Sequence, residues 1–321
     1  MNPDHSDSQE KLTDFSPGAR LLVGMAIGDA FGAGFENKNR FEITLPGDPL
    51  SCQVTDRYTD DTQMAIGVAE LLVSEKPFTE ENLAESLLAV YRRDPRPGYS
   101  PVTTRMLQDS KNGSEFLHSL SEDERRERKS DGAAMRALPI GFIPDQNEVI
   151  RCATLSARIT HGHPDAIAAT VGIALICYER YHLGRDFPEI MQNLPGKIPS
   201  LTPQGKEYLR TIIDSGWSPE IILCEHAGYG VPYTESLILL GAVISILHNY
   251  GDNPCRVLRE SILLGGDTDT TAAITLGAAL IHTEKNLPVS LMTCLESDPY
   301  GKEFLVRLGS QLDQRFPTTI P

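Results

Sequence analysis

The stretch SPGARLLVGMAIGDA, residues 16–30, decides the fold class. Its first two residues, Ser16 and Pro17, are typical of a helix start, because serine caps free backbone N–H groups and proline fits the first turn. Apolar side chains then recur, mostly at intervals of three and four residues, at Leu21, Leu22, Met25, Ala26 and Ala30. This spacing puts them on one face of an α-helix. The stretch therefore predicts a helix that packs this face into a core.

The same periodicity continues along the rest of the chain. It appears in apolar segments that begin at Met64, Leu83, Ala166, Ser236, Cys255 and Thr271. Alternating strand patterns are almost absent, with SCQVTDRY from Ser51 as the one weak candidate. The charged run SEDERRERKSD, residues 121–131, lacks an apolar stripe and predicts a solvated loop rather than a binding patch. We therefore predict an all-α protein.

Nothing in the sequence divides the chain into separate domains. It contains no repeat of fixed period and no Gly/Ser-rich linker. We expect a single compact multi-helix bundle over residues 15–321. Residues 1–14 are mostly polar and carry no apolar pattern, so we expect them to be disordered.

The composition excludes several classes of protein. Of the 321 residues, 40% are hydrophobic, but no stretch approaches the roughly 20 apolar residues that span a bilayer, so we expect a cytoplasmic protein without membrane contact. The six cysteines are scattered without CxxC spacing, which argues against a disulfide framework and a zinc cluster. A net charge of -15 argues against general nucleic-acid binding. We expect a monomer.

Two clusters of aspartate and threonine are the strongest local signals for chemistry. They are YTDDT at residues 58–62 and GGDTDTT at residues 265–271, each directly before an apolar helical segment. Capping of the helix explains one polar residue in each cluster, but it leaves the second carboxylate unexplained. Hard oxygen ligands suit magnesium or manganese rather than zinc, and four carboxylates carry enough charge for two divalent ions. These carboxylates are Asp60, Asp61, Asp267 and Asp269.

Five motifs together carry a resemblance to a known family. They begin at Gly24 (GMAIGDAFGAGFE), Tyr58 (YTDDTQMA), Asp131 (DGAAMR), Ile159 (ITHGHPDA) and Gly265 (GGDTDTTAAI). Because these five motifs occur in the same order, the chain resembles the ADP-ribosylglycohydrolase family. This family includes dinitrogenase reductase-activating glycohydrolases and ADP-ribosylarginine and ADP-ribosylserine hydrolases. The resemblance implies an all-α bundle with a binuclear magnesium or manganese site. It also implies hydrolysis of the glycosidic bond between ADP-ribose and a modified protein or small molecule.

The resemblance also implies roles for individual residues. The metal ligands are expected to be Thr59, Asp60, Asp61, Asp267, Asp269 and Thr270. Glu36, at the end of the first motif, is expected at the substrate cleft with a role in gating or proton transfer. From its sequence position alone it is an ordinary exposed glutamate at a helix end. Glu36, Asp60 and Asp61 are therefore the candidates for the catalytic proton transfer.

The remaining motifs supply candidate contacts to the substrate. These are Asp131, Gly132, Ala133, Met135, His161, Tyr229 and Tyr233. The segment DGAAMR precedes a predicted helix whose first N–H groups suit a phosphate. Family members usually have asparagine at position 131, and a carboxylate repels phosphate, so Asp131 is expected to face ribose hydroxyls or to cap the helix. Arg136 has two open interpretations, a phosphate contact and an internal salt bridge.

The other candidate contacts come from two polar turns. His161 is expected to contact a ribose, although a lone histidine is more often structural. Tyr229 and Tyr233 lie in a loop with glycine and proline, where they either pack internally or stack on adenine.

Two other functions stay open at the level of sequence. One is a relative without catalysis that binds ADP-ribose or has a structural role, which the retained aspartates disfavour. The other is a helical phosphohydrolase that cuts the diphosphate, which normally uses histidine with aspartate as metal ligands, and this chain has no histidine followed directly by aspartate. The acceptor is also open: arginine, serine, a guanidine, an acetyl ester and a nucleobase all fit the pattern.

Overall fold

The computed structural model describes residues 11–43, 56–216, 235–297 and 299–318. Within these ranges the chain forms fifteen α-helices, three short 3-10 helices and no strand longer than one isolated bridge. The α-helices are α1 (Pro17–Gly32), α2 (Asp60–Val73), α3 (Glu80–Arg93), α4 (Pro101–Asp109), α5 (Gly113–His118), α6 (Glu122–Glu127), α7 (Gln146–Arg158), α8 (Pro164–Leu183), α9 (Phe187–Lys197), α10 (Pro203–Ser215), α12 (Ser236–Tyr250), α13 (Pro254–Leu263), α14 (Thr268–Leu280), α15 (Val289–Cys294) and α16 (Lys302–Arg315). The 3-10 helices are η1 (Leu12–Asp14), η3 (Asp131–Ala133) and η4 (Leu138–Phe142). The predicted all-α bundle is confirmed.

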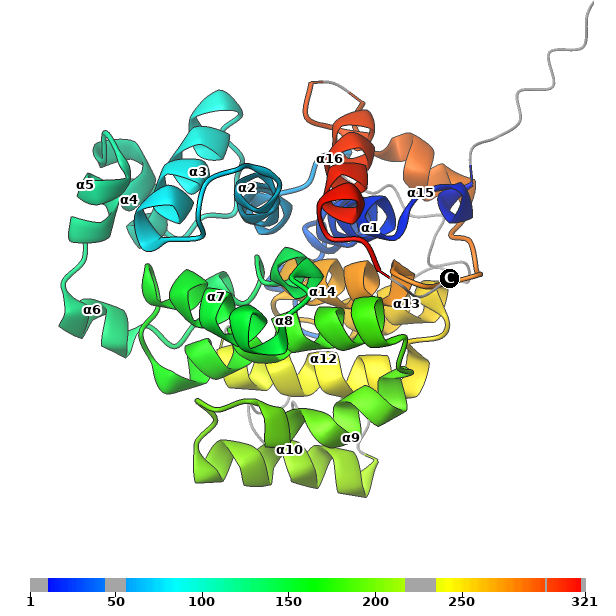
Figure 1. Ribbon diagram of the computed structural model, residues 1–321. Helices are drawn as coiled ribbons and strands as arrows, with labels where there is room; N and C mark the ends of the chain where they lie inside the picture. The colour runs from blue at the N-terminus through cyan, green and yellow to red at the C-terminus, as the bar shows by residue number, and fades with distance from the viewer. Residues whose placement is uncertain (1–10, 44–55, 217–234, 298, 319–321) are drawn as a thin grey trace, which may run out of the picture.

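The apolar segments identified by periodicity all form helices. They lie in α1, α2, α3, α8, α12, α13 and α14. In α1, α2 and α14 nearly every residue is buried, and in α8 and α12 most residues are, which is typical of helices surrounded by others. Figure 1 shows a succession from α1 through α14 and α12 to α9 and α10, and neighbouring members of this series are in contact.

Three glycines allow α1 to pack closely along α14. A Cβ atom added to Gly28 would lie 2.3 Å from the carbonyl oxygen of Ala272, and one added to Gly32 would lie 2.4 Å from the Cα atom of Asp269. Gly24, one turn earlier, faces the same helix. The spacing of four residues puts the three glycines on one face of α1. This close packing brings the end of α1 directly against the second aspartate cluster.

Three sequence predictions need correction or fall outside the described residues. The charged run 121–131 is not only a loop, because α6 forms within it on a capping box between Ser121 and Glu124. No residue of α6 is buried, but the end of the run turns inward and Asp131 is buried, so the prediction of a wholly solvated segment is wrong. Residues 1–10 lie outside the described chain, but Leu12 is buried in η1, so the expected disorder up to residue 14 extends too far. Most of the strand candidate, residues 51–55, also lies outside the described chain.

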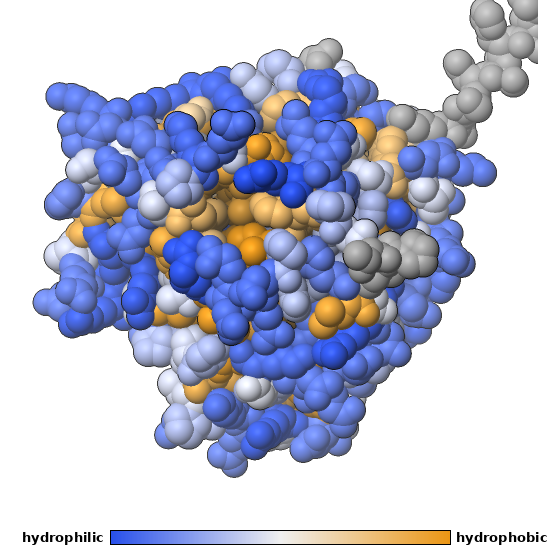
Figure 2. Space-filling model, viewed as in Figure 1, coloured by the Kyte–Doolittle hydropathy of each residue, from blue (hydrophilic) through white to orange (hydrophobic). Residues whose placement is uncertain are grey.

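The apolar side chains gather inside the bundle. The face seen in Figure 2 is mostly hydrophilic, with apolar side chains concentrated near its centre. Among the described residues, Phe41 and Leu183 are the large apolar side chains that remain exposed. None of the described helices combines the length and hydrophobicity required to cross a membrane.

Candidate functional site

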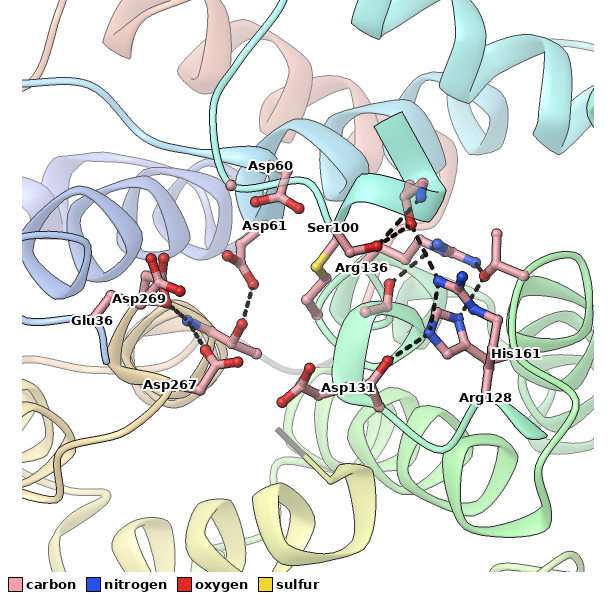
Figure 3. Close-up of a pocket in the computed structure, with 17 residues that line it drawn as sticks. Glu36, Asp60, Asp61, Ser100, Arg128, Asp131, Arg136, His161, Asp267 and Asp269 are labelled. Carbon is pink, nitrogen blue, oxygen red and sulfur yellow. Dashed lines mark hydrogen bonds between the residues drawn. The ribbon is translucent and has the colours of Figure 1, made fainter. Parts of the chain in front are cut away.

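A pocket lies where α2 and α14 begin, and its lining is polarised. Figure 3 shows carboxylates on one side of this pocket and two arginines with a histidine on the other. The carboxylate side carries Glu36, Asp60, Asp61, Asp267 and Asp269, and the other side carries Ser100, Arg128, Arg136 and His161. Thr103, Ser130, Gly132, Met135, Thr160 and Thr270 complete most of the lining, and Asp131 stands between the two sides.

The structure brings the two predicted aspartate clusters together. Thr270 donates a hydrogen bond of 2.7 Å from its hydroxyl to Oδ1 of Asp61, across 209 residues of sequence. In the first cluster, the Thr59 hydroxyl also lies 3.3 Å from Oδ2 of Asp61. In the second cluster, Asp267 is the N-cap of α14 and accepts a hydrogen bond from the backbone N–H of Thr270. The aspartates therefore share one site at two adjoining helix starts.

The glycine turn before α14 holds the segment that carries Glu36. Gly265 and Gly266 have φ values of 74° and 73°, in the left-handed region that favours glycine. The backbone N–H of Asn37 donates to the carbonyl of Gly266 at 2.8 Å, and Gly266 N–H donates to the carbonyl of Lys38 at 3.0 Å. Glu36 is exposed at the edge of the pocket, so its side chain is accessible to a bound ligand.

The aspartate cluster gathers four carboxyl groups that no cation among the described residues pairs with. Burial, followed by repulsion from the other carboxylates, raises the pKa values of Asp60, Asp61 and Asp269 well above the ordinary value. Burial likewise raises the pKa of Asp267. No lysine or arginine in the described part of the chain forms an ion pair with any of these four. A buried set of hard oxygen donors that lacks a counter-charge fits one or more divalent cations such as magnesium or manganese.

A fifth buried carboxylate, Asp29 of α1, was missed by the sequence analysis. Its side chain is fully buried, and one oxygen each of Asp29, Asp61 and Asp269 lie within 4.8 Å of one another. The signal was present as an isolated charged residue within the apolar stretch GMAIGDAFG, where burial without a partner would be costly. A carboxylate at such a position indicates a site nearby.

The loop before α4 covers the first cluster, and Arg96 fixes this loop. The guanidinium of Arg96 lies over the ring of Tyr58, 4.0 Å from its centroid, and forms ion pairs with Asp94 and Glu296. Two residues later, Gly98 has a φ of 105°, and an added Cβ atom would lie 1.9 Å from Oδ1 of Asp60. Any side chain at position 98 would clash with the Asp60 carboxylate, so the loop can approach this carboxylate only because position 98 is glycine.

We expect Gly98→Ala to turn the Asp60 carboxylate away from the pocket. The substitution adds a clash and an unfavourable backbone conformation, so it should destabilise the fold by about 1–3 kcal/mol and weaken manganese binding. Thermal unfolding and calorimetric titration measure the two effects. Gly196→Ala is the control, because nothing lies within 4 Å of its added Cβ atom. Unchanged manganese affinity in Gly98→Ala would show that this contact does not set the position of Asp60.

Arg136 is a structural residue beneath the basic side of the pocket. Its guanidinium donates to the Ser156 carbonyl at 2.6 Å and to the Thr160 hydroxyl at 2.8 Å, and also to the carbonyl of Gly132. Burial lowers its pKa to about 9, which leaves it charged at neutral pH. Of the two interpretations left open by the sequence, the internal salt bridge is not found, because no carboxylate in the described ranges pairs with Arg136 and its partners are neutral oxygens.

Arg128 is the accessible cation of the pocket, and the sequence analysis did not single it out. Its Nη2 donates to the Thr103 hydroxyl at 3.2 Å and lies 3.5 Å from Nε2 of His161. Its buried Nε has no hydrogen-bond partner, and no carboxylate among the described residues forms an ion pair with it. It was overlooked because it follows a run of exposed charges. An anion that enters the pocket finds here a guanidinium that no described carboxylate neutralises.

His161 lies in the pocket as predicted, in its neutral form. Burial, followed by the charges of Arg128 and Arg136, lowers its pKa well below the ordinary value. Its Nδ1 lies 2.8 Å from the Thr160 hydroxyl, and its Nε2 lies 3.0 Å from the Ser130 hydroxyl. His161 is therefore a neutral hydrogen-bonding group at physiological pH.

The segment DGAAMR does not begin an α-helix, so the predicted helix terminus for phosphate is wrong. Asp131 to Ala133 form the three-residue 3-10 helix η3. Gly132 and Met135 line the pocket, whereas Ala133 is fully buried behind this lining. Small side chains at this turn serve tight packing as well as ligand approach. The predicted contacts Tyr229 and Tyr233 lie outside the described residues.

Asp131 faces the pocket from η3 and meets the aspartate cluster. Burial raises its pKa to about 7, while a hydrogen bond with Asp267 lowers it. Its Oδ2 is buried and has no hydrogen-bond partner among the described residues. The carboxyl group does not cap an α-helix, and it has a free acceptor directed at the space between the two sides of the pocket.

Comparisons with known proteins identify the family. The family model described as ADP-ribosylglycohydrolase matches residues 17–319, so the chain belongs to this family. It is 26% identical to ADP-ribosylhydrolase ARH3 of Xenopus tropicalis, over 93% of this chain and 96% of the relative. It is 25% identical to ADP-ribosylhydrolase ARH3 of Homo sapiens, over 79% of this chain and 81% of the relative.

A solved structure shares the fold. It is described as an "ADP-ribosylglycohydrolase-related protein complex" and superposes with a TM-score of 0.62 at 20% identity, over 94% of this chain and 98% of that chain. The all-α architecture is therefore that of the family.

Proposed function

We propose that this protein is a metal-dependent hydrolase that cleaves the glycosidic bond between ADP-ribose and a modified acceptor. The observation that carries the proposal is the polarised pocket, with unbalanced carboxylates on one side and the unpaired Arg128 on the other. A ligand with a diphosphate and a terminal ribose fits this polarity, because the diphosphate pairs with a cation while the ribose lies toward the carboxylates. Family membership supports the same class of reaction.

The ligand set for two divalent ions comes from both helix starts. Thr59, Asp60 and Asp61 would hold them from α2, and Asp267, Asp269 and Thr270 from α14. When bound, magnesium or manganese supplies Lewis-acid chemistry at the ribose and its attacking water. The protein supplies the rigid frame, since both groups of ligands begin buried helices that pack around α1.

The residues of the chain have separate roles around the ribose. Cleavage passes through an oxocarbenium-like state, and the carboxylates around the sugar stabilise its positive charge. Asp131 accepts a hydrogen bond from a ribose hydroxyl through its free Oδ2, as the sequence analysis expected. His161, neutral and fixed by two hydroxyl groups, contacts the ligand without adding charge. Glu36 transfers a proton from the edge of the pocket.

The substrate is an ADP-ribosylated protein or an ADP-ribosylated small molecule. The acceptor leaves toward the open edge where Glu36 is exposed, so its chemistry is read by surface residues around that edge. The rival reaction at the diphosphate gives a different product. Glycosidic cleavage releases intact ADP-ribose, whereas diphosphate cleavage releases AMP and a ribose phosphate.

We expect ADP-ribose to stabilise the folded protein in the presence of magnesium, and AMP to do so much less. A ligand at 100 times its dissociation constant adds about 2.7 kcal/mol by mass action. Thermal unfolding with each ligand measures this difference. A panel of ADP-ribosylated acceptors, analysed for products, should yield ADP-ribose from at least one acceptor. Equal stabilisation by AMP, or AMP as the product, would contradict the proposal.

Arg128→Gln provides the matched variant for this test. It should reduce the stabilisation by ADP-ribose, because it removes the charge opposite the diphosphate. Arg126→Gln is the control, since Arg126 is exposed on α6 and pairs with Glu122 outside the pocket. If Arg128→Gln is stabilised as strongly as the unmodified protein, the diphosphate does not lie against Arg128.

A further inference from the structure

Asp29 lies beside the aspartate cluster, but its oxygen atoms are already occupied. Oδ1 accepts hydrogen bonds from the backbone N–H and the hydroxyl of Thr59, both at 2.8 Å. Oδ2 accepts hydrogen bonds from the backbone N–H of Thr62 at 2.9 Å and from its hydroxyl at 2.7 Å. All four donors belong to the first turn of α2 and the residue before it.

Proximity alone would make Asp29 a candidate metal ligand. One of its oxygens lies within 4.8 Å of oxygens from Asp61 and Asp269. A carboxylate has about four lone-pair sites, two on each oxygen, and four donors fill them. Asp61 and Asp269 differ, because each accepts fewer hydrogen bonds and keeps sites for a cation. The hydrogen bonds therefore separate Asp29 from its neighbours in function.

We infer that Asp29 is a positioning residue that caps the start of α2 from a different helix and thereby directs Thr59, Asp60 and Asp61 into the pocket. The inference rests on the proposed function only for the identity of these ligands. Thr59 is the N-cap of α2 by position, yet its side chain makes no capping hydrogen bond. Asp29 replaces it, because its carboxylate accepts from the N–H of Thr62 at the third helical position.

The location of Asp29 on α1 explains how the site is held in place. Gly28 and Gly32, on either side of it, allow α1 to lie directly against α14. Thr268, the first residue of α14, also donates from its hydroxyl to the carbonyl of Gly32 at 2.8 Å. The second group of ligands is thus fixed to α1 by packing, and the first is fixed to α1 by Asp29. One helix sets the relative position of both groups.

An amide cannot replace this carboxylate. Asparagine has one oxygen and one NH2 group, so one of its two ends would face the N–H and hydroxyl of a threonine with donors instead of acceptors. The backbone N–H of Thr59 or of Thr62 would lose its partner while buried. Asp29→Asn keeps the size of the side chain and therefore tests the hydrogen bonds rather than the packing.

The first test uses the metal-free protein. We expect Asp29→Asn to increase hydrogen exchange at the backbone amides of Thr59 and Thr62 at least tenfold, while the exchange of α8 stays unchanged. Glu179→Gln is the matched control, because Glu179 is another fully buried carboxylate, paired with Arg185 and Lys197, and no residue of α8 lines the pocket. It should leave exchange at the start of α2 unchanged. Unchanged exchange at Thr59 and Thr62 in Asp29→Asn would overturn the inference.

The second test distinguishes positioning from direct ligation by manganese titration. A residue that only supports the ligands should lower metal affinity by about 10–100-fold without changing the number of ions bound. Loss of one ion in Asp29→Asn would make Asp29 a ligand and overturn the inference. If the unmodified protein binds no divalent ion, the proposed function fails, and the exchange experiment still decides the role of Asp29.

A second pair of variants covers the case in which Asp29→Asn does not fold. Thr62→Val removes one hydroxyl donor to Asp29 and keeps the shape of the side chain, whereas Thr62→Ser keeps the donor. We expect weaker manganese binding and faster amide exchange at the start of α2 in Thr62→Val, with recovery in Thr62→Ser. Equal behaviour of the two variants would contradict the role assigned to Asp29.

Discussion

Asp269→Asn is expected to lower manganese affinity by more than about 100-fold and to abolish turnover, while the metal-free protein becomes more stable. Ligand loss should exceed the roughly 10–100-fold effect of residues that only support ligands. The gain in stability follows from the sign of the pKa shift. Burial and neighbouring carboxylates raise the pKa of Asp269 in the folded protein. When the pH exceeds the pKa of this group in the unfolded chain, folding must either protonate the carboxylate or bury its charge, and both lower the free energy of unfolding. Asparagine carries no charge and avoids this cost at neutral pH.

Two measurements on the same variant separate these effects. Thermal unfolding without metal should give a higher midpoint than the unmodified protein, and added manganese should raise this midpoint much less. Asp60→Asn should behave in the same way, because its pKa is raised by the same causes. Asp214→Asn is the control, since Asp214 is exposed on α10 and remote from the lining of the pocket. Normal manganese binding in either ligand variant would refute the shared site.

The fold was predictable because apolar periodicity is a local property. The segment from Ala166 and the segment from Ser236 both form helices in which most residues are buried, and their apolar composition indicates this. The 3-10 geometry of Asp131 to Ala133 was not predictable in the same way, because small residues are compatible with several turn conformations. Periodicity decides between helix and strand more reliably than it decides where a helix begins.

The meeting of the two aspartate clusters depends on tertiary contacts. The hydrogen bond between Thr270 and Asp61 joins residues that are 209 positions apart, and no spacing within either cluster encodes it. The similar composition of the two clusters suggested a common set of ligands, and the family resemblance implied that they meet in one site. Asp29 was missed for the same reason, since its four donor atoms belong to Thr59 and Thr62 at the start of α2, and a sequence shows a buried carboxylate without showing its donors.

Arg128 shows how composition can conceal a functional residue. The run before it is solvated, and its neighbours in α6 are exposed. Arg128 itself turns inward after the helix ends and reaches Thr103 and His161. The direction of a side chain at the end of a short helix depends on the loop that follows. An isolated β-bridge between Ser130 and Glu235 and a hydrogen bond from the Ser236 hydroxyl to the carbonyl of Lys129 fix that loop beside α12.

Glu36→Gln is expected to lower turnover by about 10²–10⁴-fold, the range for a positioned acid or base. Glu36 is exposed at the edge of the pocket, and the segment that carries it is hydrogen-bonded to the glycine turn before α14. Its Oε1 accepts a hydrogen bond from the side chain of Asn37 at 3.1 Å, which directs one oxygen and leaves the other free. Glutamine keeps this acceptor and removes the transferable proton.

The predicted signature of Glu36 is a change in turnover without a matching change in binding. Manganese affinity and the stabilisation by ADP-ribose should change much less than turnover, because the proposed ligands are left intact. Glu42→Gln is the control, since Glu42 is exposed in the same loop but does not line the pocket. Steady-state turnover on the best acceptor, together with calorimetric titration of manganese, provides the comparison. Near-normal turnover in Glu36→Gln would assign Glu36 to the ordinary exposed glutamates and leave Asp60 and Asp61 as the remaining candidates for proton transfer.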